Sequence, residues 1–330
     1  MKTMTKLAAA GLGLALSTSM AFAETKWDLS TAWPASNFHA KNAMAFADAV
    51  REATDGSVDI TVHVGGEIGV KITEKMSAVE NGIVQMADML LFLQAGASGE
   101  PLLSMDTLPY LIQGQDEMKA FLEVAGPTFD EIAAKHNQKI LYYVPWPSPG
   151  VYTKQAVVSA DDMSGQRIRA FNAASFEFLD KLGAAPLEMP WGDVAAAAAA
   201  GTIDGAATSS SSGVDGKLWQ FTSHFNPLNW STSSDAVTVN LDAWNALSDQ
   251  EREIIEGLAD KMEAEFWAVS AAEDSGKIAI LEENGMTVNE ADASLKAKMA
   301  EAGKAMWADY IAKNPDAQAI IDSYSAKLGK

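Results

Sequence analysis

A proline-rich break between two series of alternating strand and helix patterns limits the possible folds most strongly. The break, residues 145–150 (PWPSPG), cannot form a regular element because proline lacks a backbone donor and restricts the residue before it. On both sides of it, short apolar segments alternate with longer helical ones, which favours open, largely parallel sheets covered by helices. We therefore expect an α/β fold of two lobes, with the break as a crossover between them.

Strands and helices are predicted in each series from their hydrophobic periodicity. In the first series we expect strands at 57–64, 83–92 and 139–144, and helices at 41–54, from residue 71 to Asn81-Gly82, and at 117–136. In the second we expect strands at 151–158, 167–171, 186–189, 203–208 and 236–241, and helices at 173–182 and 191–200. The six alanines at 195–200 predict a tightly packed helix, since alanine is the best helix former.

The last third of the chain has the pattern of one very long helix. Ser248 and Glu251 have the spacing of a capping box, in which each side chain satisfies a free backbone donor of the other residue. The helical pattern continues to Asn284-Gly285, a length of about 50 Å at 1.5 Å per residue. A helix of this length is long enough to brace both lobes. Two shorter helices are expected at 293–312 and 315–328.

The N-terminus has the pattern of a secretory signal. Lys2 and Lys6 precede an apolar run at 7–16, and the small residues of Ala21-Phe22-Ala23 predict cleavage after Ala23. The run is shorter than the roughly 20 apolar residues of a membrane-spanning helix. The chain has no cysteine, so a lipid-anchored N-terminal cysteine is excluded. We expect an exported protein that works in solution outside the cytoplasm.

The net charge of the chain limits the classes of molecule that it can bind. The chain has 24 Lys+Arg against 44 Asp+Glu, a net charge of −20, and loss of the two signal lysines makes the mature protein more acidic still. Such a charge repels nucleic acid and anionic membranes, although one local arginine can still bind an anion. We expect no nucleic-acid partner.

Catalytic and metal-binding motifs are not found. The four histidines form no HxxxH or HExxH pattern, and the chain has neither a P-loop nor a GxSxG elbow. The serine run 209–212 has no base nearby in sequence, and Asp161, Asp162 and Asp193 fit surface acids or helix caps. We predict no enzyme activity, no metal and no cofactor. The alternative is a secreted lyase or hydrolase that acts on a small organic acid.

Several short motifs occur in a fixed order along nearly the whole mature chain. They are Trp33-Pro34, Asn37-Phe38-His39, Thr54-Asp55-Gly56, Gly65-Gly66, 145–147 (PWP), 163–172 (MSGQRIRAFN), 182–186 (LGAAP), 189–194 (MPWGDV) and 201–205 (GTIDG). This succession resembles the substrate-binding proteins of tripartite ATP-independent periplasmic (TRAP) transporters, of the DctP type. The chain departs from the family at 195–200, where alanines replace a Tyr and Leu-Gln. It also has Thr208-Ser209-Ser210 where sialic-acid-type members carry Asn and Pro.

The resemblance implies a two-lobed periplasmic-binding-protein fold, type II-like in its TRAP variant, with a long helix bracing both lobes. Residues 24–146 plus 235–274 would form lobe I, and residues 147–234 plus 275–330 would form lobe II, with the ligand cleft between them. The implied function is a receptor that binds a small organic anion, usually a carboxylate, and delivers it to a TRAP membrane permease. An ABC-type receptor is a further alternative. We expect a monomer.

The family pattern also implies a ligand site. Arg169 would pair with the carboxylate, because a guanidinium holds a carboxylate by two parallel hydrogen bonds. Arg167 would share its face if the strand is regular, or else be a structural arginine. Asn172 would contact the ligand, cap the next helix, or do both. The remaining candidates are aromatic residues that would wall the cleft or pack in the core, hydroxyl donors, and two residues of the first strand-to-helix loop: Trp191, Trp146, Phe171, Thr208, Ser209, Ser210, Phe38 and His39. His39 could equally be a residue that begins the following helix.

These side chains fit several classes of ligand. The hydroxyls and aromatic rings suit a small hydroxy- or oxo-acid, or an aromatic or cyclic carboxylate. A sulfonate also fits, since arginine binds both groups.

Overall fold

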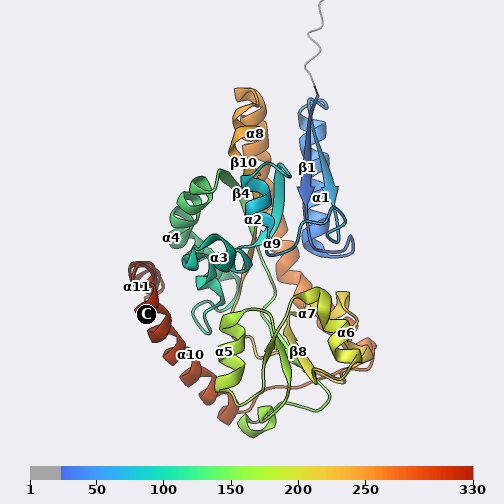
Figure 1. Ribbon diagram of the computed structural model, residues 1–330, viewed down its shortest axis with the longest axis vertical. Helices are drawn as coiled ribbons and strands as arrows, with labels where there is room; N and C mark the ends of the chain where they lie inside the picture. Colours follow the sequence, from blue (N-terminus) through green and yellow to red (C-terminus); the bar gives the residue numbers. More distant parts are fainter. Residues whose placement is uncertain (1–23, 330) are drawn as a thin grey trace, which may run out of the picture.

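The computed structural model describes residues 24–329, so the expected signal segment and its cleavage after Ala23 lie outside the described residues. Two β-sheets, one above the other along the long axis, form two lobes (Figure 1). No helix among residues 24–329 is long and apolar enough to cross a membrane. The two-lobed α/β architecture predicted from the sequence is confirmed.

Lobe I contains a five-stranded sheet in the order β2-β1-β3-β10-β4. Its strands are β1 (Thr25–Ser30), β2 (Val58–His63), β3 (Met86–Leu90), β4 (Gln138–Pro145) and β10 (Ser234–Asn240). β1 runs parallel to β2 and β3, whereas β10 is antiparallel to β3 and β4. β10 is the segment that returns from lobe II, which explains its opposite direction in a largely parallel sheet.

Lobe II contains a six-stranded sheet in the order β11-β9-β5-β8-β6-β7. Its strands are β5 (Gly150–Thr153), β6 (Ile168–Ala170), β7 (Leu187–Glu188), β8 (Gly205–Thr208), β9 (His224–Asn226) and β11 (Thr287–Val288). β6 is parallel to β7 and β8, while β5 is antiparallel to β8 and β9. The sequence did not predict β9, which is only three residues long.

Helices cover both sheets. The α-helices are α1 (Phe38–Ala53), α2 (Lys75–Glu80), α3 (Leu91–Ser98), α4 (Gly114–Lys135), α5 (Ala173–Lys181), α6 (Val194–Ala199), α7 (Ser210–Asp215), α8 (Leu241–Asn245), α9 (Asp249–Glu283), α10 (Ala293–Lys313) and α11 (Ala317–Leu328). Short 3₁₀ helices are η1 (Pro101–Thr107), η2 (Ala160–Met163), η3 (Trp191–Asp193) and η4 (Leu218–Gln220).

Helix α9 links the lobes as expected. It spans 35 residues, and Ser248 and Glu251 form the predicted capping box at its start. It packs against α1 and β4 of lobe I and against α7 and β11 of lobe II. Phe266 belongs to the core of lobe I, whereas Leu281 belongs to a core of lobe II. One helix therefore contributes to both hydrophobic cores.

Helices α10 and α11 form a second connection on the outside of the molecule (Figure 1). Leu295 and Met299 of α10 pack into the core of lobe II. Helix α11 instead packs against α4 of lobe I, where Tyr324 meets Phe121 edge-on with ring centroids 5.5 Å apart. The expected range 275–330 for lobe II therefore includes a helix that packs on lobe I.

Three local predictions differ from the structure. The apolar run 83–92 contains a strand only at Met86–Leu90, and α3 begins at Leu91. The strand expected at 151–158 ends at Thr153. The alanine helix is not tightly packed: four of its alanines are exposed, and Val194 is the buried residue of α6. Alanine favours a helix through its own conformational preference, so the run forms α6 without needing a packed environment.

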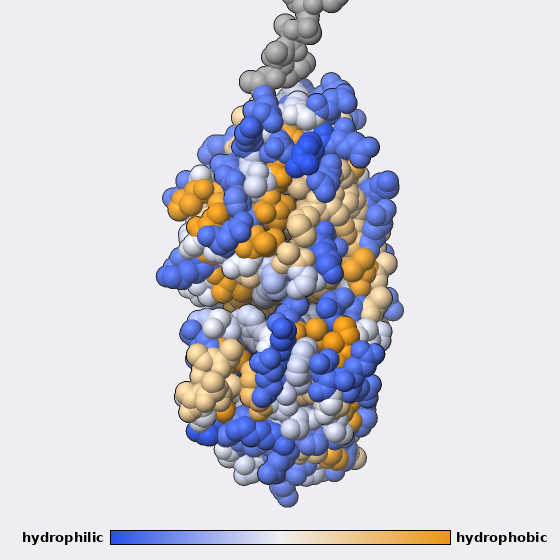
Figure 2. Space-filling model, turned by 90° about the vertical axis from the view of Figure 1, so that its right-hand side faces the viewer, coloured by the Kyte–Doolittle hydropathy of each residue, from blue (hydrophilic) through white to orange (hydrophobic). Residues whose placement is uncertain are grey.

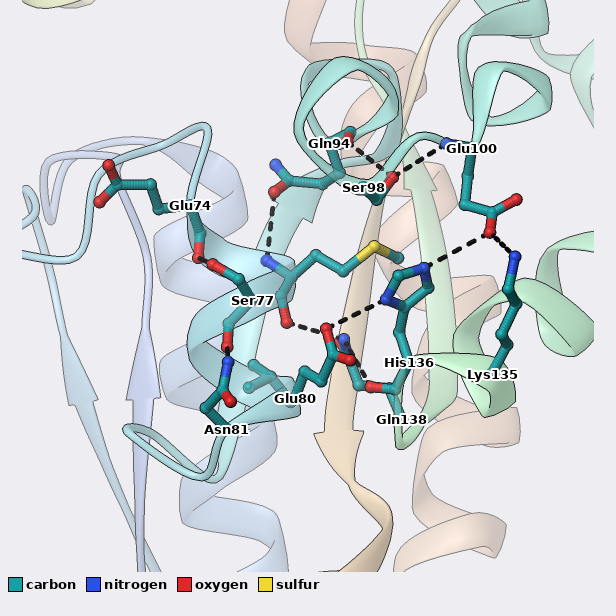
Figure 3. A network of polar contacts seen from close by, with 12 residues as sticks. Glu74, Ser77, Glu80, Asn81, Gln94, Ser98, Glu100, Lys135, His136 and Gln138 are labelled. Carbon is teal, nitrogen blue, oxygen red and sulfur yellow. Dashed lines mark hydrogen bonds and ion pairs between the residues drawn. The ribbon is translucent and has the colours of Figure 1, made fainter.

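A polar network holds the outer part of lobe I (Figure 3). His136, at the end of α4, places Nδ1 3.0 Å from the Glu80 carboxylate of α2, and Gln138 Nε2 donates to the Met76 carbonyl at 2.9 Å. Lys135 forms an ion pair with Glu100. These contacts connect α2, α4, β4 and the residue that precedes η1, so they fix one side of the sheet that carries the cleft wall.

Candidate functional site

A cavity of about 710 Å³ lies between the lobes. Trp33, Phe92 and Trp146 line it from lobe I. Lobe II contributes a charged, an aromatic and a hydroxyl-bearing group of residues: Arg169, Phe171, Asn172, Trp191, Thr208 and Ser209. The space-filling view shows the boundary between the lobes as a notch in the outline (Figure 2). The site therefore has apolar aromatic walls and a small number of polar groups, which is typical of small-molecule pockets.

Arg169 is the central residue of β6. Its neighbours Ile168 and Ala170 belong to the core of lobe II, so strand alternation turns Arg169 to the opposite face. The Nε atom donates to the Met189 carbonyl at 3.1 Å, and Nη1 donates to the Ala207 carbonyl at 3.1 Å. Both carbonyls belong to the ends of the neighbouring strands β7 and β8. The sheet itself therefore holds the guanidinium in one orientation.

The charge of Arg169 is buried without an acidic partner. The residue is 4% exposed, and no carboxylate of the described residues lies within 4.0 Å of its guanidinium. The rings of Trp191 and Phe171 lie 5.6 and 6.0 Å from its Cζ atom. Burial lowers the pKa of Arg169 to about 10, partly offset by the negative charge of Glu188, so the side chain is cationic at neutral pH. An anion bound in the cavity would supply the missing countercharge.

Arg167 occupies a different environment. It precedes β6, and its Nε and Nη2 atoms donate to the Asp204 carboxylate at 2.9 and 2.8 Å. Its side chain is 46% exposed and does not line the cavity. The strand begins at Ile168, so strand alternation does not bring Arg167 to the face of Arg169. We therefore do not retain Arg167 as a ligand residue.

Asn172 caps a helix, as one of its two expected roles, and its side chain also lies at the cavity. Its Oδ1 accepts from the Ser175 amide at 2.8 Å and caps α5, and the residue also lines the cavity. Its Nδ2 donates across the cleft to Thr107 Oγ1 at 3.3 Å. The side chain therefore joins helix α5 of lobe II to η1 of lobe I.

The three predicted hydroxyl donors separate into two groups. Thr208 and Ser209, at the end of β8, line the cavity. Ser210 is fully buried, and its hydroxyl donates to Asp274 of α9 at 2.6 Å. Because α7 begins at Ser210, the chain turns there and points this side chain toward the long helix. Ser210 is therefore not positioned to contact a ligand.

Phe38 and His39 lie behind the cavity wall. Both belong to the first turn of α1, where Asn37 is the N-cap, and neither lines the cavity. The ring of His39 lies 4.4 Å from Trp146, and that of Phe38 lies 5.3 Å from it. Burial lowers the pKa of His39 well below its ordinary value, so it is neutral. Phe38 and His39 therefore begin a helix, which was the alternative for His39, and do not lie on a loop; they support Trp146 from behind.

Other lining residues were not predicted. Trp33 follows β1, at the strand end where ligands bind in α/β sheets, and its Trp-Pro motif was noted without a role. Phe92 was not recognised as a lining residue because it ends the apolar run 83–92, which was predicted to be one strand. Glu188 at the end of β7 had no recognisable signal, although it also lines the cavity.

One cluster has the composition of a metal site. His39, Asp88 and Asp235 each place a ligand atom within 4.8 Å of the others, and all three are buried. The Oδ2 atom of Asp235 already accepts the indole N–H groups of Trp33 and Trp146 at 3.1 and 2.9 Å. The cluster is therefore a hydrogen-bonded group that contacts two cavity residues.

Comparison with known families identifies the class of this protein. The model of the bacterial extracellular solute-binding proteins of family 7, DctP, matches residues 29–314. The chain belongs to this family. The DctP assignment and the solute-receptor role predicted from the sequence are thereby confirmed, and proteins of this family are periplasmic.

Solved structures of DctP-type receptors superpose closely on this chain. DctP6 of Bordetella pertussis, an extracytoplasmic solute receptor binding pyroglutamic acid, is 30% identical with a TM-score of 0.86, covering 92% of this chain and 100% of its own. DctP7 of the same organism, which also binds pyroglutamic acid, is 28% identical with a TM-score of 0.86, covering 91% and 99%.

Two further relatives differ in source. A TRAP solute-binding protein from a marine metagenome, specific for pyroglutamate, is 32% identical with a TM-score of 0.86, covering 92% of this chain and 100% of its own. The ectoine-binding periplasmic protein TeaA of Halomonas elongata is 27% identical over 65% of this chain and 64% of its own.

Proposed function

We propose that this DctP-type protein is a receptor for a small cyclic carboxylate, with pyroglutamate as the first candidate, and that it carries out no catalysis. The observation that carries the proposal is Arg169: a buried cation, oriented by two backbone carbonyls, with no acidic partner among the described residues. Two parallel N–H donors of a guanidinium match a carboxylate, and removal from water strengthens the pairing.

The walls of the cavity support a cyclic ligand. Trp33 and Trp146 of lobe I, with Phe171 and Trp191 of lobe II, present flat apolar surfaces that suit a compact ring. Thr208 and Ser209 supply hydroxyls that can donate to or accept from a lactam. Pyroglutamate combines a carboxylate, a five-membered ring and a lactam. The three solved relatives between 28% and 32% identity bind this same compound.

Binding would be followed by closure of the lobes. The carboxylate would first pair with Arg169 on lobe II, and the ring would then pack against Trp33 and Trp146 of lobe I. Because the ligand contacts both lobes, it would favour the closed arrangement. The closed monomer would then dock on a TRAP permease, and no nucleic acid takes part.

Ectoine is the second candidate. Glu188 lines the same cavity as Arg169, and its negative charge raises the pKa of that arginine. A zwitterionic ring could place its carboxylate at Arg169 and its cationic part toward Glu188. The resemblance to the ectoine-binding TeaA supports this alternative.

Calorimetry and thermal unfolding of the mature protein test the proposal. Pyroglutamate is expected to bind stoichiometrically and to raise the melting temperature, since a ligand at 100 times its Kd stabilises by about 2.7 kcal/mol. Proline, which lacks the lactam carbonyl, should bind more weakly than pyroglutamate. A titration with ectoine tests the second candidate ligand in the same way. Mass spectrometry should recover the ligand unchanged. Failure of pyroglutamate to bind, or its conversion to a product, would overturn the proposal.

A further inference from the structure

Both cavity tryptophans of lobe I are held by one carboxyl group. Trp33 Nε1 donates to Asp235 Oδ2 at 3.1 Å, and Trp146 Nε1 donates to the same oxygen at 2.9 Å. The two rings meet edge-on with centroids 4.8 Å apart. The three residues come from the loop after β1, the crossover after β4 and the start of β10. Asp235 thus joins three separate segments of the cavity wall.

A second acid accompanies Asp235. Asp88 of β3 pairs with Val237 of β10, so it lies on the same face of the sheet as Asp235. Its Oδ2 accepts from Thr31 Oγ1 at 3.0 Å, and its Oδ1 accepts from Trp33 Nε1 at 3.3 Å. Both acids are 2% exposed. Two carboxylates this close in a buried site cannot both be ionised without a large cost.

The charges around the pair indicate which acid keeps a proton. Burial raises the pKa of Asp88, but the positive charge of Lys75 opposes this rise; Lys75 is fully buried and donates to the Ser30 carbonyl at 2.8 Å. Burial raises the pKa of Asp235 well above its ordinary value, and the charge of Asp88 raises it further. Asp235 is therefore the acid of the pair that holds a proton more readily, and its Oδ2 atom is the one that accepts both indoles.

We propose that Asp235 is a positioning residue of the ligand site, which fixes the edge-to-face orientation of Trp33 and Trp146 so that their rings form an aromatic wall for a cyclic ligand. The importance of this wall for the ligand rests on the proposed function. A binding site needs its contacting groups held within about 0.5 Å by supporting residues. Asp235 supplies that support from behind the two rings, while Phe38 and His39 pack against Trp146.

Two substitutions of Asp235 distinguish the effect of its hydrogen bonds from the effect of its side-chain size. Asp235→Asn keeps an oxygen for the indoles and offers an N–H to Asp88, so it retains the arrangement. Asp235→Leu has a similar size but removes the acceptor of the Trp146 indole and the nearer of the two acceptors of the Trp33 indole, which keeps only Asp88 at 3.3 Å. Asn240→Leu is the matched control: Asn240 is a buried amide on the same strand, it donates to the Val79 carbonyl at 2.8 Å, and it does not line the cavity.

Calorimetric titration with pyroglutamate provides the first measurement. Asp235→Leu is expected to raise Kd about tenfold or more, and Asp235→Asn to stay within about threefold of the parent protein. Asn240→Leu should lower the unfolding free energy without changing Kd. An unchanged Kd in Asp235→Leu would overturn the proposal, as would an equal rise in Asn240→Leu.

The indole N–H resonances of the ligand-free protein provide a second measurement, which does not depend on the ligand. The signals of Trp33 and Trp146 are assigned with Trp→Phe variants. They should move in Asp235→Leu and stay in place in Asn240→Leu. If the parent protein fails to bind pyroglutamate but these signals move, the proposed ligand is wrong and the positioning role stands. Unmoved signals would overturn the positioning role. If Asp235→Leu does not fold, both measurements are made on Asp235→Ser, whose hydroxyl reaches at most one indole.

Discussion

The two lobes bury charged groups on opposite sides of the same cavity, and these groups differ in the partners that the protein gives them. In lobe I, burial raises the pKa values of Asp88 and Asp235, the charge of Lys75 opposes the rise at Asp88, and the two acids accept hydrogen bonds from Thr31 and the cavity tryptophans. In lobe II, Arg169 is bonded to neutral carbonyls and has no carboxylate partner among the described residues. A buried charge is costly unless it is paired.

The contrast separates structural charges from a functional one. Asp88 and Asp235 of lobe I accept hydrogen bonds from groups of the protein itself, and these bonds hold the shape of the aromatic wall. The cation of lobe II is left to be neutralised by something that enters the cleft. Each side can be tested on its own, because removing a balanced group should lower stability, while removing an unbalanced one should lower ligand affinity.

Arg169→Ala should have the largest effect. The carboxylate would lose its charged partner in a site shielded from water, which weakens binding of pyroglutamate by about 4 kcal/mol, or roughly a thousandfold. The unfolding free energy should remain unchanged or increase, because a buried charge without a partner has been removed. Calorimetry and urea denaturation measure the two quantities. Arg169→Lys keeps the positive charge but cannot form two parallel hydrogen bonds to a carboxylate. Its affinity for pyroglutamate should therefore lie between those of the parent protein and Arg169→Ala. Binding of the alanine variant within threefold of the parent would contradict the assignment.

A pH effect is expected from a third buried acid of lobe I. Burial raises the pKa of Asp106 to about 7, opposed by hydrogen bonds from Ser234. The folded protein therefore holds a proton that the unfolded chain, with a pKa of about 3.9, has released. Its contribution to stability is fully present below about pH 4 and is lost as the pH rises through about 7, a total of about 4 kcal/mol.

Asp106→Asn tests this contribution because an amide does not ionise. The variant should lose less stability than the parent between pH 4 and pH 7. Urea denaturation across this range measures the slope, and the binding of pyroglutamate at pH 7 should stay within about twofold, since Asp106 does not line the cavity. Equal slopes for the two proteins would show that Asp106 ionises in the folded state as it does in water.

A direct contact between the lobes gives a smaller prediction. Asn37 Nδ2 donates to Asp215 of α7 at 2.7 Å, while its Oδ1 accepts from the His39 amide and caps α1. Asn37→Asp preserves the cap, because aspartate is an equally good N-cap residue, but places two carboxylates against each other across the cleft. Affinity for pyroglutamate should fall about tenfold through a less stable closed form, with little change in melting temperature.

The double variant Asn37→Asp/Asp215→Asn checks that the loss comes from this contact. It restores one acid and one amide with their roles exchanged, so affinity should return to within about threefold of the parent. If the double variant binds no better than Asn37→Asp alone, the contact does not contribute to closure.

Much of the fold was predictable because its signals are local. The capping box of α9 and the Asn172 cap depend on residues three positions apart, and both were identified. Arg169 was identified from the family pattern. Its environment could not be predicted, because the carbonyls that orient it belong to Met189 and Ala207, 20 and 38 residues further along the chain.

The missed features depend on distant contacts or ambiguous periodicity. Asp235 lies 202 residues from Trp33 and 89 from Trp146, and nothing in the sequence connects them. A continuous apolar run such as 83–92 cannot be divided into strand and helix by periodicity alone, so Phe92 was placed in the wrong element.

The smallest effect on affinity is expected for Arg167→Ala, two residues before the arginine whose substitution should have the largest effect. Arg167 pairs with Asp204 on the surface of lobe II, and exposed ion pairs contribute little because water and salt screen them. Arg167→Ala should therefore leave the Kd for pyroglutamate within about twofold and lower the melting temperature only slightly. Calorimetry at the conditions used for Arg169→Ala gives the comparison. A large loss of affinity in Arg167→Ala would mean that ligand recognition depends on the charge of the whole strand, whereas a small one assigns it to the single arginine that faces the cleft.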